Sequence, residues 1–401
     1  MTATNHCDQA DLVANKNLIH FNNAGASLMP KTVLQTQIEH LTLEASIGGY
    51  EAANEKSAQI DALYHSVAKL INCQSEEVAL VENATIAWMS AFYSIDFKAG
   101  DRILTAEVEY ASNYIAYLQL KRQKGVIVDV IPSNAAGEIC CQSLEAMIDD
   151  KVKLISITHI PTNGGLINPA EAVGVIAKKH NILYLLDACQ SVGQMPVDVA
   201  AIGCDILTAT SRKYLRGPRG AGFLYVSNRV IEDLHPAMID LRGAQWTELD
   251  QYQLQAGAKR FENWENNYAA LLGMGCAIDY ALDIGLQQIA ERAFALARYT
   301  REQLSQLESV QVYDIGSQKC AIVTFASSKL TSDKLVKILK GYNINVSCSS
   351  PGSTLIDASK RQLPKLVRAS VHYFNDKSQV DHLLIALQKI LSTEHLATEQ
   401  R

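Results

Sequence analysis

The sequence contains no long hydrophobic run and no excess of positive charge. None of its apolar stretches reaches the roughly 18 residues that a membrane-spanning helix needs, so we expect no membrane partner. The chain of 401 residues carries 36 Lys and Arg against 42 Asp and Glu, a net charge of −6, which argues against nucleic acid as its main partner. The first residues lack a charged segment followed by an apolar core, so we expect no signal peptide and a cytoplasmic location.

Cysteine pairs with metal-ligand spacing are also absent. The nine cysteines are odd in number, and none belongs to a Cys-x-x-Cys pair, which argues against a disulfide framework and a zinc site. We expect reduced thiols that serve mostly as small buried hydrophobic residues. They are Cys7, Cys73, Cys140, Cys141, Cys189, Cys204, Cys276, Cys320 and Cys348.

Short apolar, β-rich runs alternate with longer helical stretches through most of the chain. We expect strands over 78–85, 101–108, 125–133, 153–160, 182–189, 205–211 and 221–227. Helices are expected near 86–98, 112–124, 142–150 and 169–180. This rhythm, with strands that are apolar almost throughout, predicts an α/β fold: a mostly parallel, seven-stranded sheet flanked by helices.

The pattern changes after about residue 265. Two long helices are expected to meet near Gly285, followed by shorter strands and a final helix, which is typical of a smaller α+β domain. The length of the chain suggests two or three domains. We therefore expect an N-terminal arm over 1–20, a large domain over 21–265 and a small C-terminal domain over 266–401.

Two strand ends carry residues that can do chemistry together. Asp187 closes the strand in LLDACQ, Gln190 follows it, and Lys213 comes after the next strand. Asp187 alone could be a helix cap, and a lone lysine is usually solvated. Together, however, a desolvated lysine is a Schiff-base nucleophile, and a buried aspartate keeps a pyridine nitrogen protonated. The combination predicts pyridoxal 5'-phosphate (PLP) as cofactor.

A phosphate group needs its own cradle. Ala84 and Thr85 stand between a strand and an apolar helix, where backbone N–H groups bind anions, although a plain helix cap would look the same. Thr210 and Arg212 flank Lys213 and could add a hydroxyl and a cation. The same stretch, ATSRKYLRGPRGAGFLYVS, also carries Arg216 and Arg219, which could bind an anion or form a salt-bridged loop.

The sequence resembles the class V, aminotransferase-fold PLP enzymes of the cysteine desulfurase-like group. The matching segments follow the order of the family over most of the chain. They are ENAT, EVEYASN, HIPTNGGLINPA, LLDACQSVGQMPVD, TSRKYLRGPRGAGFLYV, FENWENNYAALLGMGCAIDYAL and VRASVHYFN. The resemblance implies fold type I of the PLP enzymes and a homodimer in which each subunit completes the site of the other, with FENWEN at the interface.

The resemblance also implies a role for each matched residue. Lys213 bonds the cofactor aldehyde, Asp187 pairs with the ring nitrogen, and Gln190 bonds the ring hydroxyl. The phosphate is held by Ala84, Thr85, Thr210 and Arg212, and Tyr110 stacks on the ring. Arg368 takes the substrate carboxylate, Thr162 lies near the cofactor, and Asn163, Asn23 and Gly25 line the substrate pocket.

Three departures from the desulfurase pattern bear on the reaction. Arg212 stands where these enzymes usually have histidine, and Trp264-Glu265-Asn266 replaces a Gly-Thr-Pro phosphate loop. Cys348 lies in the region of their nucleophilic cysteine but lacks the histidines before it, so it can be read as an ordinary thiol or as a persulfide-forming nucleophile.

These departures are similar to the hercynylcysteine sulfoxide lyase-like branch and related C–S lyases, which need no cysteine nucleophile. We therefore expect a PLP-dependent C–S lyase that acts by β-elimination on a cysteine-derived amino acid such as cysteine, cystine or a cysteine sulfoxide. Three alternatives stay open: a cysteine desulfurase that uses Cys348, a class V aminotransferase or epimerase, and a catalytically silent protein that binds a partner.

Overall fold

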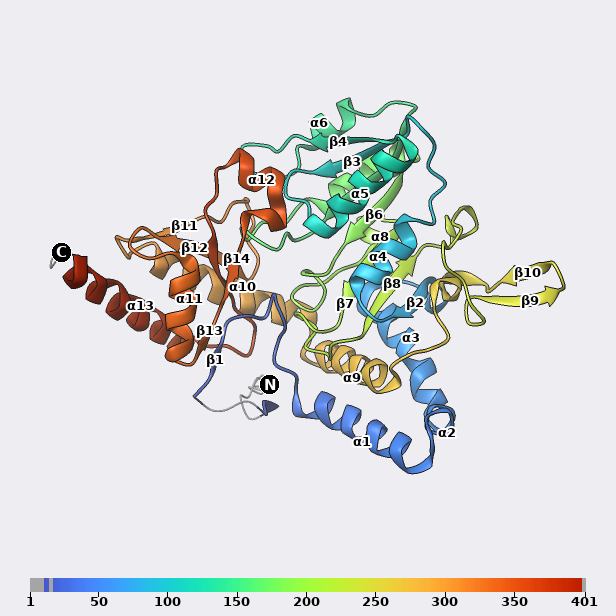
Figure 1. Ribbon diagram of the computed structural model, residues 1–401, viewed down its shortest axis with the longest axis horizontal. Helices are drawn as coiled ribbons and strands as arrows, with labels where there is room; N and C mark the ends of the chain where they lie inside the picture. The colour runs from blue at the N-terminus through green and yellow to red at the C-terminus, as the bar shows by residue number, and fades with distance from the viewer. Residues whose placement is uncertain (1–10, 14–16, 399–401) are drawn as a thin grey trace, which may run out of the picture.

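The computed structural model describes residues 11–13 and 17–398, so Cys7 and most of the predicted N-terminal arm lie outside the described residues. A seven-stranded sheet forms the centre of the larger part of the molecule (Figure 1). Its strands are β2 (Val78–Val81), β3 (Arg102–Ala106), β4 (Ile127–Ile131), β5 (Val152–Thr158), β6 (Leu183–Asp187), β7 (Ile206–Thr210) and β8 (Gly222–Val226). Six of them fall within the predicted ranges, and β5 begins one residue before its predicted range of 153–160.

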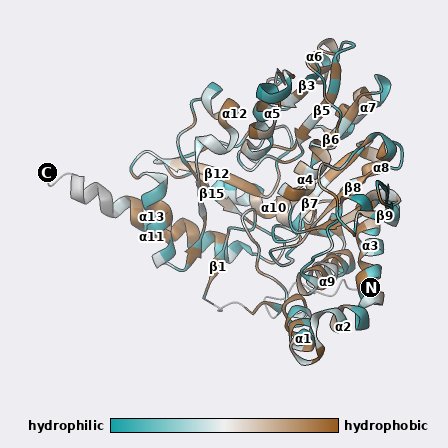
Figure 2. Cartoon of the chain, turned by 45° about the vertical axis from the view of Figure 1, so that its right-hand side comes forward, coloured by the Kyte–Doolittle hydropathy of each residue, from teal (hydrophilic) through white to brown (hydrophobic). Residues whose placement is uncertain are grey.

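The strand order is β2-β8-β7-β6-β5-β3-β4, and every neighbouring pair is parallel except the two that involve β8. The predicted α/β fold with a mostly parallel seven-stranded sheet is confirmed. All strands except the partly exposed edge strand β4 are mostly buried, and alternate side chains enter different hydrophobic clusters, as Leu185 and Leu186 do. In Figure 2 these central strands carry mostly the hydrophobic colour.

Helices cover both faces of the sheet. The predicted helices correspond to α4 (Ala84–Phe92), α5 (Ala111–Lys124), α6 (Cys141–Ala146) and α7 (Ala170–Lys179), and a short α8 (Val199–Ile202) follows. Side chains of α4 and α5 share a cluster with one face of the sheet, whereas those of α7 share a cluster with the other face. This arrangement leaves the strand ends open for a ligand.

Three N-terminal helices were not predicted: α1 (Lys31–Ile47), α2 (Gly49–Glu55) and α3 (Ser57–Ile71). Helix α3 buries an apolar stripe that includes Leu63, Val67 and Ile71 in the same cluster as α7. A hairpin of β9 (Ala244–Glu248) and β10 (Gln251–Leu254) was missed as well, and it projects from the large domain (Figure 1).

The two long helices expected around Gly285 are α9 (Tyr268–Ile284) and α10 (Leu286–Leu304). Gly285 has φ 93°, a conformation that favours glycine, and the two helices meet at an 80° bend. Among the described residues no single helix is long and apolar enough to cross a membrane; only this bent pair meets that test jointly, by length and composition.

The C-terminal part has a four-stranded sheet in the order β11-β12-β15-β14, made by β11 (Val310–Val312), β12 (Ile322–Ser327), β15 (Leu366–Ser370) and β14 (Ser347–Ser349). Its helices are α11 (Ser332–Gly341), α12 (Leu355–Lys360) and α13 (Lys377–Thr398). Near the N-terminus, β1 (Ile19–His20) pairs in parallel with β13 (Ile344–Asn345). Short 3₁₀ turns cover Ser75–Glu77, Ile231–Asp233, Gly257–Phe261 and Pro351–Thr354.

The hydrophobic clusters bear on the predicted domain boundaries. Helix α9 packs with the large sheet through Met274 and Ile278, whereas α10 contributes Ala293 and Leu296 to the cluster of the C-terminal sheet. Phe21, from the predicted large domain, joins this second cluster too. The division at residue 265 stays a prediction.

Candidate active site

Three strands of the large sheet end side by side in polar residues. Thr158, Asp187 and Thr210 close β5, β6 and β7, and Thr158 lies opposite Asp187 in the β5–β6 register. Lys213 follows three residues after Thr210. Because these strands are parallel, their carboxyl ends lie at one edge of the sheet, where α/β proteins bind their ligands.

Asp187 is fixed from two sides. Its Oδ1 accepts a hydrogen bond from the backbone N–H of Cys189 at 3.0 Å, and its Oδ2 accepts one from Nδ2 of Asn113 at 3.0 Å. The side chain is buried, so its orientation is set by these two donors. A carboxylate held in this way can pair with a protonated ring nitrogen, as predicted.

Lys213 is half-buried and forms no ion pair with a carboxylate in the described part of the chain. Burial lowers the pKa of its ammonium group, and the nearby cations Arg212 and Arg368 lower it further, against the opposing charge of Asp187. The amine is therefore closer to its neutral, nucleophilic form than an exposed lysine, as Schiff-base chemistry requires.

The hydrogen bonding of Gln190 tests whether the predicted cofactor fits this site. Its Nε2 donates to the backbone oxygen of Ala24 at 3.2 Å, but its buried Oε1 has no partner among the described residues. A buried acceptor without a donor is costly unless a ligand supplies one. The hydroxyl on the PLP ring is such a donor, so the side chains around Lys213 and Asp187 fit this group.

Three of the four predicted phosphate residues, Ala84, Thr85 and Thr210, lie at the start of α4. Thr210 is buried opposite Gly222 in the β7–β8 register, and a side chain at Gly222 would meet the backbone of Asn83 at 3.1 Å, so the N-cap of α4 lies beside Thr210. Ala84 and the exposed Thr85 open the helix, whose N-terminus favours anions. Arg212 lies nearer the N-terminal segment, because its Nη1 donates to the backbone oxygen of Gly25.

Arg368 is the predicted carboxylate-binding residue, and it sits on β15 with only 9% of its surface exposed. Its Nη1 donates to Oγ1 of Thr162 at 2.6 Å and to the backbone oxygen of Thr162 at 3.1 Å, and its Nε donates to Oγ of Ser347 at 3.1 Å. It has no carboxylate partner among the described residues. A buried guanidinium held by neutral groups is suited to an incoming carboxylate.

Tyr110 lies near two of these residues, Arg212 and Arg368. It caps α5 directly after the loop from β3, its side chain is partly exposed, and its phenol acts on the pKa of both Arg212 and Arg368. This position suits the predicted ring-stacking role.

Three other predicted substrate residues already have protein partners. Asn23 donates to the backbone oxygen of Ser370 at 2.8 Å and accepts from Ser27 at 2.7 Å, while Asn163 bonds Ser349 and Ser353. Gly25 contributes its carbonyl to Arg212. Through these contacts, the segment around Asn23 and the loop around Asn163 are both joined to the C-terminal part of the chain.

Cys348 faces away from Arg368. In the β14–β15 register Ser347 lies opposite Arg368 and Cys348 opposite Val367, so the Cys348 side chain occupies the other face of this sheet. Burial, together with a hydrogen bond to the Asp333 carboxylate on α11, raises the pKa of the Cys348 thiol to about 11. The thiol is protonated and directed at α11 rather than at Lys213.

Arg216 is neither an exposed anion ligand nor part of a salt-bridged loop in the described structure. Its guanidinium carbon lies 4.4, 5.2 and 5.7 Å from the ring centroids of Phe374, Tyr373 and Tyr280, and its Nε donates to the backbone oxygen of Leu28 at 2.9 Å. The backbone takes φ 63°, which is uncommon for a side chain of this size. This buried cation–π contact ties the turn after Lys213 to the residues that follow β15.

Glu109 was quoted in EVEYASN but not recognised as part of the site. It is buried between β3 and α5 and shares Asn113 with Asp187. The signal available in the sequence was a carboxylate between a strand end and the start of a helix.

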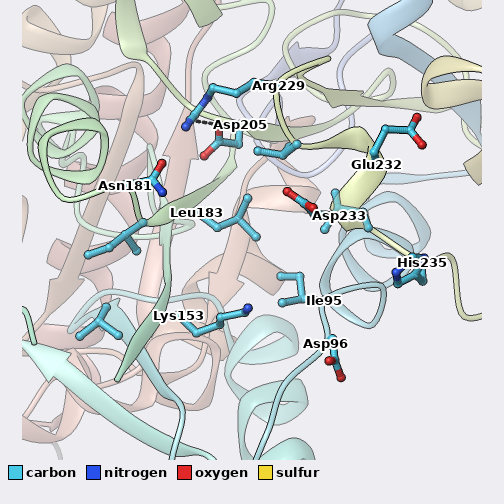
Figure 3. Close-up of a pocket in the computed structure, with 14 residues that line it drawn as sticks. Ile95, Asp96, Lys153, Asn181, Leu183, Asp205, Arg229, Glu232, Asp233 and His235 are labelled. Atoms are coloured by element: carbon cyan, nitrogen blue, oxygen red, sulfur yellow. Dashed lines mark hydrogen bonds and ion pairs between the residues drawn. The ribbon is translucent and has the colours of Figure 1, made fainter. Parts of the chain in front are cut away.

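A surface pocket of about 550 Å³ lies at the amino ends of the central strands, on the side of the sheet away from Lys213 (Figure 3). It borders Val152 and Leu183, the first residues of β5 and β6, and the ion pair between Asp205 and Arg229. It is therefore separate from the cleft at the carboxyl ends of these strands.

Comparisons with known proteins agree with this geometry. A cysteine desulfurase of Yersinia pseudotuberculosis is 29% identical over 390 residues, which cover 93% of each chain. The apo structure of a cysteine desulfurase from Thermococcus onnurineus NA1 superposes with a TM-score of 0.90 at 25% identity, over 98% of this chain and 99% of the other. The fold is also shared with the cystine C–S lyase C-DES in complex with its product cysteine persulfide, with a TM-score of 0.84 at 21% identity over 93% and 97% of the chains.

The model of the family described as "Aminotransferase class-V" matches residues 19–383, which is most of the chain. The predicted resemblance to the class V, cysteine desulfurase-like PLP enzymes, the fold type and the cofactor are thus confirmed, whereas the closer similarity to the hercynylcysteine sulfoxide lyase-like branch stays a prediction. This chain belongs to the class V aminotransferase family, whose cofactor is pyridoxal 5'-phosphate.

Proposed function

We propose that this protein cleaves the carbon–sulfur bond of a cysteine-type amino acid. The observation that carries the proposal is the buried Arg368, which has no carboxylate partner in the described structure and, like Asp187, lies near enough to Lys213 to affect its pKa. The relatives named cysteine desulfurases match nearly the whole chain, and they support a sulfur-containing amino acid as the substrate.

Each residue of the site would have a defined role in the reaction. Arg368 binds the α-carboxylate and orients the amino acid. Lys213 removes the Cα proton as a general base, and Asp187 keeps the proton on the ring nitrogen of the cofactor. Bound PLP supplies an electron sink for the negative charge that develops at Cα. Tyr110 and Gln190 hold the ring in place.

The relatives favour the desulfurase reaction, which the sequence analysis kept as an alternative, over the β-elimination that it preferred. A desulfurase transfers sulfur to an acceptor thiol and leaves alanine. Cys189 lies two residues after Asp187 and near Lys213, but burial raises the pKa of its thiol well above the ordinary value, and the charge of Asp187 raises it further, so it is a poor acceptor in this form.

A second candidate is the β-elimination itself, and a specific observation favours it. Cys348 faces Asp333 on the opposite side of β14 from Arg368, so it cannot take sulfur from a substrate held by Arg368 without a change in this strand. A lyase needs no acceptor thiol and ends with pyruvate and ammonia.

The products distinguish the two reactions. Purified enzyme loaded with PLP is incubated with L-cysteine and with cystine, and alanine, pyruvate and sulfide are quantified. Alanine supports the desulfurase, and pyruvate supports the lyase. If neither forms, while a keto acid supports amino-group exchange, the proposal of C–S cleavage is wrong and the aminotransferase alternative gains.

We also propose a homodimer. The β9–β10 hairpin projects from the large domain and exposes Trp246, Tyr252 and Leu249, the last to 94%; Trp264 of the FENWEN segment is half-exposed (Figure 1). Such apolar groups favour burial by another chain. Sedimentation equilibrium at micromolar concentration should give twice the mass of 44.0 kDa, and a Trp246→Ser/Tyr252→Ser double variant should shift it toward one copy.

A further inference from the structure

Two buried carboxylates at the carboxyl edge of the sheet are bridged by one amide. Glu109 is 3% exposed and Asp187 is 6% exposed. Nδ2 of Asn113 donates one hydrogen bond to Oε1 of Glu109 at 2.9 Å and another to Oδ2 of Asp187 at 3.0 Å. Both amide hydrogens are therefore shared between the two carboxylates.

Glu109 is itself held by three further donors. Its Oε1 accepts from Oγ1 of Thr158 at 2.5 Å and from the backbone N–H of Tyr110 at 2.9 Å, and its Oε2 accepts from Oγ1 of Thr105 at 3.1 Å. These donors come from β5, the start of α5 and β3. The carboxylate is thus fixed before any ligand binds.

We propose that Glu109 is a positioning residue of the cofactor site, which acts through Asn113 to hold Asp187 toward the ring nitrogen and adds a second negative charge behind it. The inference rests on PLP binding and not on which C–S reaction follows. It assigns a role to a residue that makes no contact with substrate.

The geometry explains how this would work. Because Glu109 accepts from the NH₂ group of Asn113, the amide cannot turn its carbonyl oxygen toward Asp187 without losing both hydrogen bonds. Oδ1 of Asp187 is occupied by the N–H of Cys189, so Asp187 cannot rotate freely. Two negative charges on one side of the ring favour a proton on its nitrogen.

The charge of Glu109 changes near neutral pH. Burial raises its pKa to about 7, against the hydrogen bond from Thr158, and the negative charge of Asp187 raises it further. The other titratable groups that face it in the described structure are Tyr117 on α5 and, beyond Asp187, Lys213. In the protein without cofactor the second charge is therefore present above about pH 7 and is lost below it, and a positively charged ring nitrogen would extend the charged form to lower pH.

The test compares two carboxylates of the same loop. Glu109→Gln keeps the shape of the side chain and removes its charge, whereas Glu107→Gln is the control, because Glu107 pairs with Lys360 and Ser133 instead. Each protein is loaded with PLP, and the visible spectrum of the bound cofactor is followed from about pH 5.5 to about pH 9. Wild type and Glu107→Gln should show a transition near neutral pH that Glu109→Gln lacks.

Glu109→Gln should also bind PLP roughly tenfold more weakly, the effect of about one charge-assisted hydrogen bond. A spectral titration of Glu109→Gln that superimposes on wild type would overturn the inference, as would an equal loss in both variants. If Glu109→Gln does not fold, Asn113→Ala removes the bridge alone, and an unchanged PLP dissociation constant then overturns it. Failure of wild type itself to bind PLP would overturn the cofactor assignment as well.

Discussion

Replacement of Arg368 tests the substrate site most directly. Arg368→Met removes the guanidinium but keeps a long, flexible side chain on β15, and Arg368→Lys keeps the charge without the two-pronged geometry. Arg368 donates hydrogen bonds to Thr162 but to none of Lys213, Asp187 and Gln190, so both variants should keep the absorption of bound PLP.

The expected size of the effect follows from the contacts. A carboxylate bound by Arg368 would receive two charge-assisted hydrogen bonds, each contributing about 1.5–3 kcal/mol. Their loss in Arg368→Met therefore amounts to about 3–6 kcal/mol, or a fall in kcat/KM by a factor of roughly 10² to 10⁴. Arg368→Lys should recover part of this, since an ammonium still attracts the carboxylate.

The assay is steady-state formation of alanine or pyruvate from L-cysteine, with cofactor content measured in the same samples. The fall should appear mainly in KM, because the carboxylate is bound in the ground state as well as in the transition state. Retention of kcat/KM within about fivefold in Arg368→Met, with PLP bound, would refute the assignment of Arg368.

The remaining predictions concern four residues. Lys213→Ala should bind PLP without a bond that borohydride can fix, as mass spectrometry of the reduced protein shows; a fixed adduct would mean that another amine bonds the cofactor. Cys348→Ala should keep its full rate of product formation, because the thiol faces Asp333, and a loss of alanine formation would contradict this. Arg216→Met should lower the unfolding free energy by about 2 kcal/mol, since it removes the cation–π contacts and a hydrogen bond; an unchanged Tm would count against it. In the apo protein, stability should fall as pH rises from 4.5 to about 7, because Glu109 binds its proton more tightly in the folded state. The loss amounts to about 3 kcal/mol and should be absent in Glu109→Gln, as denaturant unfolding at pH 5 and pH 8 checks.

The sheet could be predicted from the sequence because its strands are short and apolar, and all of them except the edge strand β4 are mostly buried. Helix α1 was missed because it buries little besides Val33 and His40, so it has no apolar stripe to detect. The β9–β10 hairpin was missed for a similar reason, since nearly all of its residues are exposed and no burial pattern marks it. The stripe of α3, in contrast, was present in the sequence and could have been found.

The site was predictable where a rare combination of residue types follows two strands, as with Asp187 and Lys213, although each residue alone has commoner uses. It was not predictable where a role depends on side-chain direction. The sequence does not show that Cys348 faces α11 or that Arg216 lies among aromatic rings, because both depend on contacts between distant segments. Glu109 belongs to the same group, since its bridge to Asp187 passes through a third residue.

The pairing of β14 with β15 has one further consequence. Ser347 and Cys348 are consecutive, and alternation along the strand presents the hydroxyl to Arg368 and hides the sulfur. A slip of a single position, whether by deletion in the preceding turn or by a bulge, would exchange the two atoms. Whether a hydroxyl or a thiol lies beside Arg368 is thus set by the register of one short strand.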